Sequence, residues 1–288
     1  MGENKKSLID FDAMHSVQLE ILREFDRVCR KNNIRYFLIF GTLIGAVRDH
    51  AIIPWDDDID VVVPRMDYER LLQLDQSEWK TPFFFQTAEN SPDYCKCYAK
   101  LRNSDTTLIE RTERHKNINH GISIDIYSMI NLADDMRKRK IQLIYSAIYM
   151  LLTENHPAQN HGRFFKFASA VVIKITPTII KERLKKACEK KMLAYLNIKT
   201  RDSFILAGFN GLKIPIRNKY FKRTAYGKLG DYEFPIPSGY HEYLTITYGD
   251  YMKRPEKKEQ DMKVEGFIKV DVNRPYTYYK NKLYFVKE

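Results

Sequence analysis

One short stretch constrains this chain more than any other, because four aspartates in five residues run directly into an apolar, β-branched segment. The order is Trp55-Asp56-Asp57-Asp58-Ile59-Asp60, followed by Val61-Val62-Val63. Residues two apart on a β-strand point to the same face. Asp58 and Asp60 are therefore expected to project together while Ile59 enters the core. Two carboxylates on one face repel each other unless a cation lies between them.

Carboxylate oxygens on a rigid strand are ligands that suit Mg²⁺ or Mn²⁺, so Asp58 and Asp60 are predicted to form a metal site. For Asp56 and Asp57 we favour a surface turn, since metal binding does not require their geometry. Asp125 is the candidate third carboxylate, because it interrupts a strand of alternating apolar residues at 121–129. A buried aspartate there needs a cation or a hydrogen-bonding partner; the alternative is that it caps the strand end.

Basic and small residues near these carboxylates suggest a phosphate-binding site. Gly41 and Thr42 stand where a predicted strand meets a predicted helix, and such a junction offers backbone N–H groups to an anion. Arg48 ends that helix and either binds phosphate or complements the helix dipole. Lys100 and Arg102 share one strand face, and they either bind phosphate oxygens or form a solvated edge.

Composition limits the classes of protein and partner. The chain has 288 residues, 44% of them hydrophobic, and a net charge of +11. That charge favours an anionic partner such as a nucleotide, a polyphosphate, anionic lipid or nucleic acid, but no RNA-recognition signature is present. The four cysteines lack zinc-site spacing, and the N-terminus lacks the apolar segment of a signal peptide. A reducing, cytoplasmic location is therefore predicted.

The order of predicted elements indicates an α/β (α+β) protein with a mixed sheet. The predicted helices and strands cover 15–31 (helix), 35–40 (strand), 42–48 (helix), 58–63 (strand), 67–74 (helix), and the strand-like segments 82–87, 94–102 and 121–129. Three regions follow: a catalytic core over 1–135, a helical insertion over 136–200 and a C-terminal part over 201–288 that completes the site.

The acidic motif and its surroundings resemble the LicD family, a phosphotransferase branch of the nucleotidyltransferase-fold superfamily to which fukutin belongs. The resemblance rests on Gly41-Thr42-Leu43-Ile44-Gly45, on 53–60 and on His120-Gly121-Ile122-Ser123-Ile124-Asp125. Pro235-Ile236-Pro237 and 248–252 add to it. Where the family often continues as Asp-Ile-Phe-Pro-Leu-Asp, this chain reads 125–130 as Asp-Ile-Tyr-Ser-Met-Ile. The difference spares the aspartate and leaves the choice of donor open.

The resemblance implies a nucleotidyltransferase-like mixed sheet, with Asp58, Asp60 and Asp125 as the catalytic, metal-binding residues and Mg²⁺ or Mn²⁺ as the cofactor. It also implies transfer of phosphocholine, or a similar phospho-alcohol, from a CDP-linked donor to a sugar hydroxyl of teichoic acid, lipopolysaccharide or capsule. Lys100 and Arg102 would then stabilise the leaving CMP phosphate. His120 is a candidate to support the site from behind Asp125, although a structural hydrogen bond is the commoner role for such a histidine.

Other functions are compatible with the same residues. The fold also supports nucleotidyl transfer from an NTP, and related donors include CDP-ribitol and CDP-glycerol. A non-catalytic RNA- or membrane-binding protein is a third class, against which the retained carboxylates argue. The basic, apolar segment 164–177, with Lys181, Lys185 and Lys186 beyond it, either lies against the inner face of the cell membrane or packs on 141–152 as core. A lipid-linked or nascent polysaccharide acceptor would suit the first arrangement.

Overall fold

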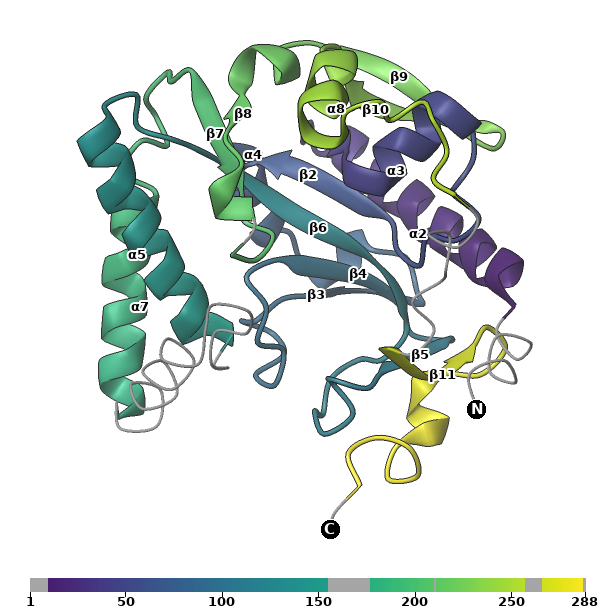
Figure 1. Ribbon diagram of the computed structural model, residues 1–288. Helices are drawn as coiled ribbons and strands as arrows, with labels where there is room; N and C mark the ends of the chain where they lie inside the picture. The colour runs from purple at the N-terminus through teal and green to yellow at the C-terminus, as the bar shows by residue number, and fades with distance from the viewer. Residues whose placement is uncertain (1–9, 155–176, 210, 257–265, 287–288) are drawn as a thin grey trace. The chain divides into compact units, whose positions relative to one another are not determined.

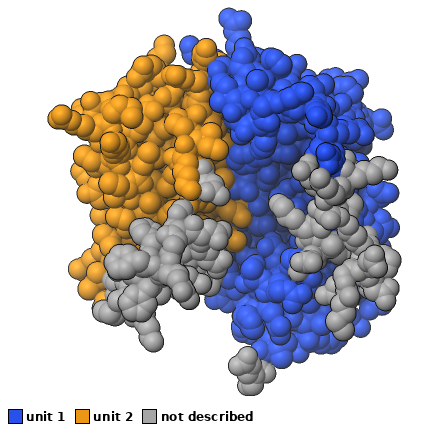
Figure 2. Space-filling view, viewed as in Figure 1, with its two compact units in different colours: residues 1–94, 99–127, 220–288 blue, residues 95–98, 128–219 orange. Residues whose placement is uncertain are grey.

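The computed structural model describes residues 10–154, 177–209, 211–256 and 266–286, and its chain forms two compact units (Figures 1 and 2). Unit 1 takes in residues 1–94, 99–127 and 220–288, and unit 2 takes in 95–98 and 128–219. The predicted membrane-contact segment 164–177 lies, except for Pro177, outside the described residues. Among the described residues, no helix combines the length and the apolar character needed to cross a bilayer.

The described residues form both helices and strands, as expected for a mixed α/β (α+β) protein. The helices are α2 (Phe11–Lys31), α3 (Phe40–Ile44), α4 (Arg65–Leu72), α5 (Met136–Glu154), α7 (Thr178–Met192) and α8 (Tyr240–Tyr248). The strands are β1 (Phe37–Leu38), β2 (Asp60–Pro64), β3 (Phe83–Gln86), β4 (Ala99–Asn103), β5 (Thr107–Glu110), β6 (Ile122–Asn131), β7 (Asp202–Ile205), β8 (Ile216–Arg217), β9 (Thr224–Leu229), β10 (Tyr232–Pro237) and β11 (Phe267–Asp271).

Unit 1 is built on a sheet with the strand order β1-β2-β6-β4-β3. Figure 1 draws β2 and β6 in the same direction, whereas β4 pairs antiparallel with β6 and with β3, so the sheet is mixed. The register sets Lys100 of β4 opposite Asp125 of β6. The backbone N–H of Asp125 donates to the carbonyl of Ile59, 2.8 Å away, just before β2. The strands therefore bring the acidic stretch at 56–60 beside Asp125.

Helix α2 forms where its periodicity predicts and packs against the sheet at β4. The Asp10 carboxylate caps its N-terminus by accepting the Ala13 N–H at 2.9 Å, and Arg30 and Lys31 complement the dipole in its last turn. Its apolar face, which includes Phe25, is fully buried. The helix is thereby fixed on the same sheet that carries the acidic residues.

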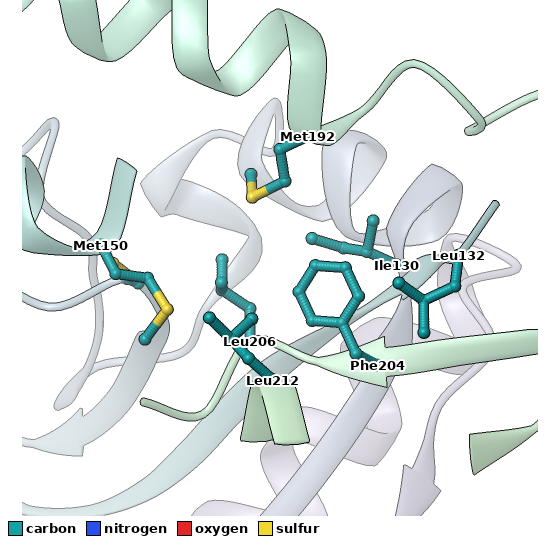
Figure 3. Packing of buried hydrophobic residues seen from close by; sticks show 8 residues of the cluster. Ile130, Leu132, Met150, Met192, Phe204, Leu206 and Leu212 are labelled. Atoms are coloured by element: carbon teal, nitrogen blue, oxygen red, sulfur yellow. The ribbon is translucent and has the colours of Figure 1, made fainter. Parts of the chain in front are cut away.

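Unit 2 contains the last residues of β6, which pair with β7, and β7 pairs with β8. Helices α5 and α7 lie against each other within this unit. Both fall in the stretch predicted to be helical, 136–200. The core of the unit gathers apolar side chains from the strands, the helices and the turn at 211–213 (Figure 3): Cys97, Ile130, Leu132, Met150, Met192, Phe204, Leu206 and Leu212.

Replacing Phe204 by alanine is expected to destabilise the protein by about 3–5 kcal/mol, because its side chain is fully buried in this cluster and the change leaves a cavity. Urea denaturation followed by circular dichroism measures the loss. The control is Ile179→Ala on α7, whose side chain is 69% exposed and should change stability by less than about 0.5 kcal/mol. Equal stability of the two variants would show that Phe204 is not a core residue.

Candidate active site

The acidic loop before β2 is held in place by α2. His15 Nε2 is hydrogen-bonded to the backbone carbonyl of Asp56, 2.8 Å away. Gln18 is 1% exposed, and its Nε2 donates to the carbonyl of Asp57 at 2.9 Å. Both contacts use backbone carbonyls and leave the carboxylates of the loop to other partners. Nothing in the sequence marks His15 or Gln18 as part of the site, because they lie about forty positions from the loop and look like ordinary helix residues.

The strand–helix junction at 39–42 positions the start of β2. The Ile39 N–H donates to the carbonyl of Asp60 at 3.1 Å, and the buried Thr42 Oγ1 accepts the N–H of Asp60 at 2.8 Å. Thr42 lies in the first turn of α3, three residues after its N-cap Ile39. Its hydroxyl holds the backbone of a key aspartate, a role that local sequence cannot reveal.

Gly41 and Asp56 are in close contact across this junction. A Cβ placed on Gly41 would overlap the Asp56 carboxylate, and glycine leaves the space that this carboxylate occupies. Phe40, immediately before it, has φ of 52°, in the left-handed region that costs a non-glycine residue free energy. The predicted phosphate cradle at Gly41 and Thr42 is therefore bordered by the carboxylate of Asp56.

Replacing Gly41 by alanine is expected to displace the Asp56 side chain and to lower activity by at least about tenfold, because a misplaced group in an active site is costly. The melting temperature should change little, since only the half-buried side chain of Asp56 has to move. The matched control is Gly266→Ala, where an added Cβ meets nothing within 4 Å. If Gly41→Ala kept full turnover, the position of the Asp56 carboxylate would be irrelevant to activity.

The pKa values of Asp58 and Asp60 are both raised by burial and by neighbouring carboxylates, Asp125 among them. Burial is the largest cause that raises the pKa of Asp58, followed by the charges of Asp56, Asp125 and Asp57; Lys100 opposes them, and the resulting pKa is about 8. Burial and then the charges of Asp58 and Asp125 hold the pKa of Asp60 well above its usual range. The structure thus brings Asp58, Asp60 and Asp125 together.

Asp60 has a buried oxygen without a hydrogen-bond partner among the described residues. The residue is 7% exposed, and the oxygen is Oδ1. A buried carboxylate oxygen in this state carries a large free-energy cost unless something else satisfies it. Asp58 precedes β2 and Asp60 begins it, so the two are near each other without both being strand residues.

Asp56, Asp57 and Asp58 form a second grouping that overlaps the first. Each offers a carboxylate oxygen, and these oxygens all lie within 4.8 Å of one another. All three residues are half-buried. Oxygen atoms at this spacing are able to surround one hard cation. The sequence interpretation of Asp56 and Asp57 as a plain surface turn missed this convergence, which arises from the path of the loop and not from strand alternation.

Lys100 faces Asp125 across the sheet. Its Nζ lies 2.9 Å from Asp125 Oδ1 and 3.4 Å from Glu110 Oε1, and Lys100 is buried. Burial alone would lower the pKa of Lys100, but the two carboxylates outweigh it and raise that pKa above its usual value. The lysine is therefore charged, and the alternative of a solvated edge is wrong for it.

Tyr127 supports Asp125 from the other side. Its hydroxyl donates to Asp125 Oδ2 at 3.3 Å, and its ring makes an edge contact with Phe40 at 5.8 Å between centroids. The strained Phe40 is thus tied to the third carboxylate through one aromatic ring. This hydroxyl stands where the resembling motif has phenylalanine, so it is a feature of this chain's version of the site.

The remaining predicted residues have structural partners. Arg48 donates to Asp49 Oδ2 at 2.8 Å and to the carbonyl of Tyr251 at 3.1 Å. Arg102 is 1% exposed and donates to Gln86 Oε1 at 2.6 Å, so the solvated-edge alternative is wrong for it too.

His120 is likewise held by the fold. Its Nε2 is hydrogen-bonded to the carbonyl of Lys116 at 3.1 Å, and burial lowers its pKa to about 4. It is therefore neutral at physiological pH. No interaction links its side chain to Asp58 or Asp60 in the part of the chain that the structure describes.

Tyr248, at the end of α8, belongs to the stretch 248–252 that adds to the family resemblance, but the sequence assigned it no role in the site. Burial and then the charges of Asp60, Asp56 and Asp58 raise its pKa, and its side chain is 45% exposed. It is therefore a partly exposed aromatic residue under the electrostatic influence of these aspartates. With 19 tyrosines in the chain, composition could not distinguish this one.

A mixed α/β sheet that gathers buried carboxylates beside a strand–helix junction is compatible with an enzyme that handles phosphate groups. Residues 33–147, which include Asp58, Asp60 and Asp125, match the family described as "LicD/FKTN/FKRP, nucleotidyltransferase domain". Over these residues the chain carries a domain of the LicD family, and the similarity supports a phosphotransferase.

Similar curated proteins come from two bacterial genera. The lipopolysaccharide cholinephosphotransferase LicD of Haemophilus influenzae is 28% identical over 257 residues, which cover 85% of this chain and 92% of that protein. Two uncharacterised proteins, from Rickettsia prowazekii and Rickettsia typhi, are 40% and 42% identical over 55 residues, about a fifth of this chain and of each relative. The long match extends well beyond the family domain.

Proposed function

We propose that this protein transfers phosphocholine, or a similar phospho-alcohol, from a CDP-linked donor to a sugar hydroxyl of a cell-surface glycan. The observation that carries the proposal is the convergence of Asp58, Asp60 and Asp125, with one oxygen of Asp60 unpartnered among the described residues. The relationship to a lipopolysaccharide cholinephosphotransferase supports the choice of phosphocholine and of a glycan acceptor. Lipopolysaccharide, teichoic acid and capsule are the classes of acceptor glycan that this proposal includes.

A divalent cation is part of this proposal, and the residues present fit one. The raised pKa values of Asp58 and Asp60 reflect burial and mutual repulsion, which a cation would relieve. Mg²⁺ or Mn²⁺ would be held by Asp58, Asp60 and Asp125, with Asp56 and Asp57 adjacent. Bound there, the ion would neutralise the donor diphosphate and lower the pKa of the attacking hydroxyl.

The proposed reaction breaks one bond and forms one. The acceptor hydroxyl oxygen bonds to the phosphorus that carries the choline, and the bond from that phosphorus to the CMP oxygen breaks. Asp125, oriented by Lys100 and Tyr127, receives the hydroxyl proton. The charged Lys100 also offsets negative charge as CMP leaves. At the strand–helix junction, the backbone N–H groups of Gly41 and Thr42 would face the donor phosphates.

A choline headgroup carries a permanent positive charge and binds aromatic faces. Tyr248 offers such a face near Asp60 and Asp58. The combination of a ring and nearby carboxylates would favour a quaternary ammonium over the neutral hydroxyl chain of ribitol or glycerol. Tyr248 is therefore the residue we propose to contact the transferred alcohol.

We further propose that the enzyme works on the cytoplasmic side of the membrane, where CDP-linked donors are available to it. Ile141 and Ile144 on α5 and Ile179 and Ile180 on α7 are each more than half exposed. Apolar side chains among lysines favour an interfacial position on anionic lipid. Co-sedimentation with anionic liposomes at low salt tests this, and a protein that stays in the supernatant would exclude membrane contact through the chain itself.

A product assay separates the proposed function from its alternatives. The protein is incubated with an acceptor glycan and, in separate reactions, CDP-choline, CDP-ribitol, CDP-glycerol, CDP-ethanolamine or CTP, and products are identified by mass spectrometry. Release of CMP with CDP-choline is expected, and no pyrophosphate should form from CTP. Pyrophosphate from CTP would identify a nucleotidyltransferase, and CMP from another CDP-alcohol alone would replace phosphocholine by that group.

A further inference from the structure

Unit 1 contains a polar pocket that the proposed chemistry does not use. Its volume is about 340 Å³, within the range of small-ligand sites. The wall comes from the loop after β3, from the turns at 104 and 117–119 and from the C-terminal segment 276–284. The side chains that matter most are Ser104, Asn117, Tyr276, Thr277, Lys280 and Tyr284.

The C-terminal wall of the pocket is anchored at both ends. The Thr107 hydroxyl donates to the carbonyl of Arg274 at 2.8 Å, and the N–H of Phe285 donates to the carbonyl of Arg114 at 2.7 Å. Strand β11, just before this segment, pairs with β5. The pocket is therefore a fixed feature of the fold, and its far wall lies outside the matched family domain at 33–147.

The lining of the pocket is typical of a site for a hydroxylated ligand. Amide and hydroxyl groups alternate with tyrosine rings, and the described lining residues include no carboxylate. The ammonium of Lys280, the one lysine among them, lies 5.4 Å from the centroid of the Phe285 ring. Hydrogen-bonding groups fix orientation in such sites, while flat rings cover the apolar faces of the ligand. A neutral sugar has both kinds of surface.

Tyr284 gives a second, independent indication. Its side chain is 1% exposed and lines the pocket, and its hydroxyl has no hydrogen-bond partner among the described residues. The His120 ring lies behind it, 4.3 Å away between centroids. Burial raises the pKa of Tyr284 above its usual value, so the hydroxyl keeps its proton. Because a buried donor without a partner is costly, an oxygen of a water or of a bound ligand would stabilise the Tyr284 hydroxyl.

The pocket and the carboxylate cluster are joined by one strand. Lys100 of β4 pairs with Asp125, whereas Ser104 directly follows the last residue of β4. Four residues of extended chain span about 13 Å. A short oligosaccharide is long enough to occupy the pocket with one unit and to reach Asp125 with another.

We propose that this pocket binds a neutral saccharide unit of the acceptor glycan, at a distance from the hydroxyl that receives the phospho-alcohol. The inference rests on the proposed function and extends it, because such a subsite would decide which glycan is modified. Binding energy at the subsite would position the reacting hydroxyl without contributing to donor cleavage.

Ligand-detected saturation-transfer NMR tests the proposal. The probes are the methyl glycosides of glucose, galactose and N-acetylglucosamine, at millimolar concentration with the full chain in EDTA. Saturation transfer to at least one glycoside is expected for the wild type and for Asp58→Asn. Thr277→Trp, which fills the pocket from an exposed position, should reduce that transfer at least about fivefold. The control is Asn273→Trp, at an exposed position three residues before the segment 276–284, where the side chain does not line the pocket.

Tyr284→Phe removes only the unpartnered hydroxyl, and we expect it to weaken glycoside binding by roughly three- to tenfold. In turnover, the same variant should raise KM for the acceptor and leave KM for the donor and kcat unchanged. Absence of saturation transfer to all three glycosides in the wild type, or full binding by Thr277→Trp, overturns the inference. Glycoside binding without CMP release from any CDP-alcohol would instead contradict the proposed function alone.

Discussion

Replacing Asp60 by asparagine is expected to lower transfer at least about a thousandfold, an activation cost of roughly 4 kcal/mol. The asparagine side chain has the same volume but no charge with which to hold a divalent cation. The same change should raise the melting temperature of the protein in EDTA by roughly 2 °C or more, because it removes a buried carboxylate that burial and the charges of Asp58 and Asp125 oppose. Activity is measured as CMP release and stability by differential scanning calorimetry.

The two readouts together separate a catalytic role from a structural one. A residue needed only for folding would lose activity and stability in parallel, whereas Asp60→Asn should lose activity and gain stability. Asp105→Asn, at an exposed position, is the matched control and should change neither. Turnover close to that of the wild type with saturating Mg²⁺ would remove Asp60 from the metal site.

Removal of divalent cations is expected to abolish transfer completely, and Mg²⁺ or Mn²⁺ should restore it. Ca²⁺ should restore it poorly, since it prefers more ligands and longer distances than these cations do. Binding to the folded state should also raise the melting temperature in proportion to the logarithm of cation concentration. That rise should disappear in Asp60→Asn, because the pair of Asp58 and Asp60 is broken.

Calorimetry in EDTA with added MgCl₂ gives the stability part of this test, and CMP release in the same buffers gives the activity part. Gly266→Ala serves as a folded control with an intact cluster. Full activity after exhaustive EDTA treatment would contradict metal dependence. If activity depends on Mg²⁺ but the melting temperature does not change with Mg²⁺ concentration, then the cation binds as a complex with the donor and not to the free protein.

The parts of the fold that sequence predicted are those with a local pattern. Helix α2 was predicted from its apolar face, and strand β6 from strict alternation around Asp125; both are confirmed. Their bounds extend beyond the predicted ones by a few residues because terminal turns and strand ends depend on partners. Strand β2 begins at Asp60, two residues later than expected. The residues just before it form a loop, in which the backbone carbonyls of Asp56 and Asp57 bond to side chains of α2 instead of to a neighbouring strand.

Contacts between distant segments explain what sequence could not predict. The closeness of Asp56 to Gly41, the two bonds from α2 and the burial of Lys100 and Arg102 all depend on which elements meet in space. The two basic residues of a strand look the same in the sequence whether the neighbouring strand places an aspartate beside them or they point into solvent. The role of Tyr248 depends on the return of α8 toward residues nearly 190 positions earlier.

The most direct test of the central proposal is to follow each phosphorus of the donor separately. CDP-choline is prepared with radioactive phosphorus either next to choline or next to cytidine, and both forms are incubated with the protein, Mg²⁺ and an acceptor glycan. We predict that label next to choline passes to the glycan and that label next to cytidine stays in CMP. Label from the cytidine side on the glycan would show nucleotidyl transfer and would contradict the proposed reaction.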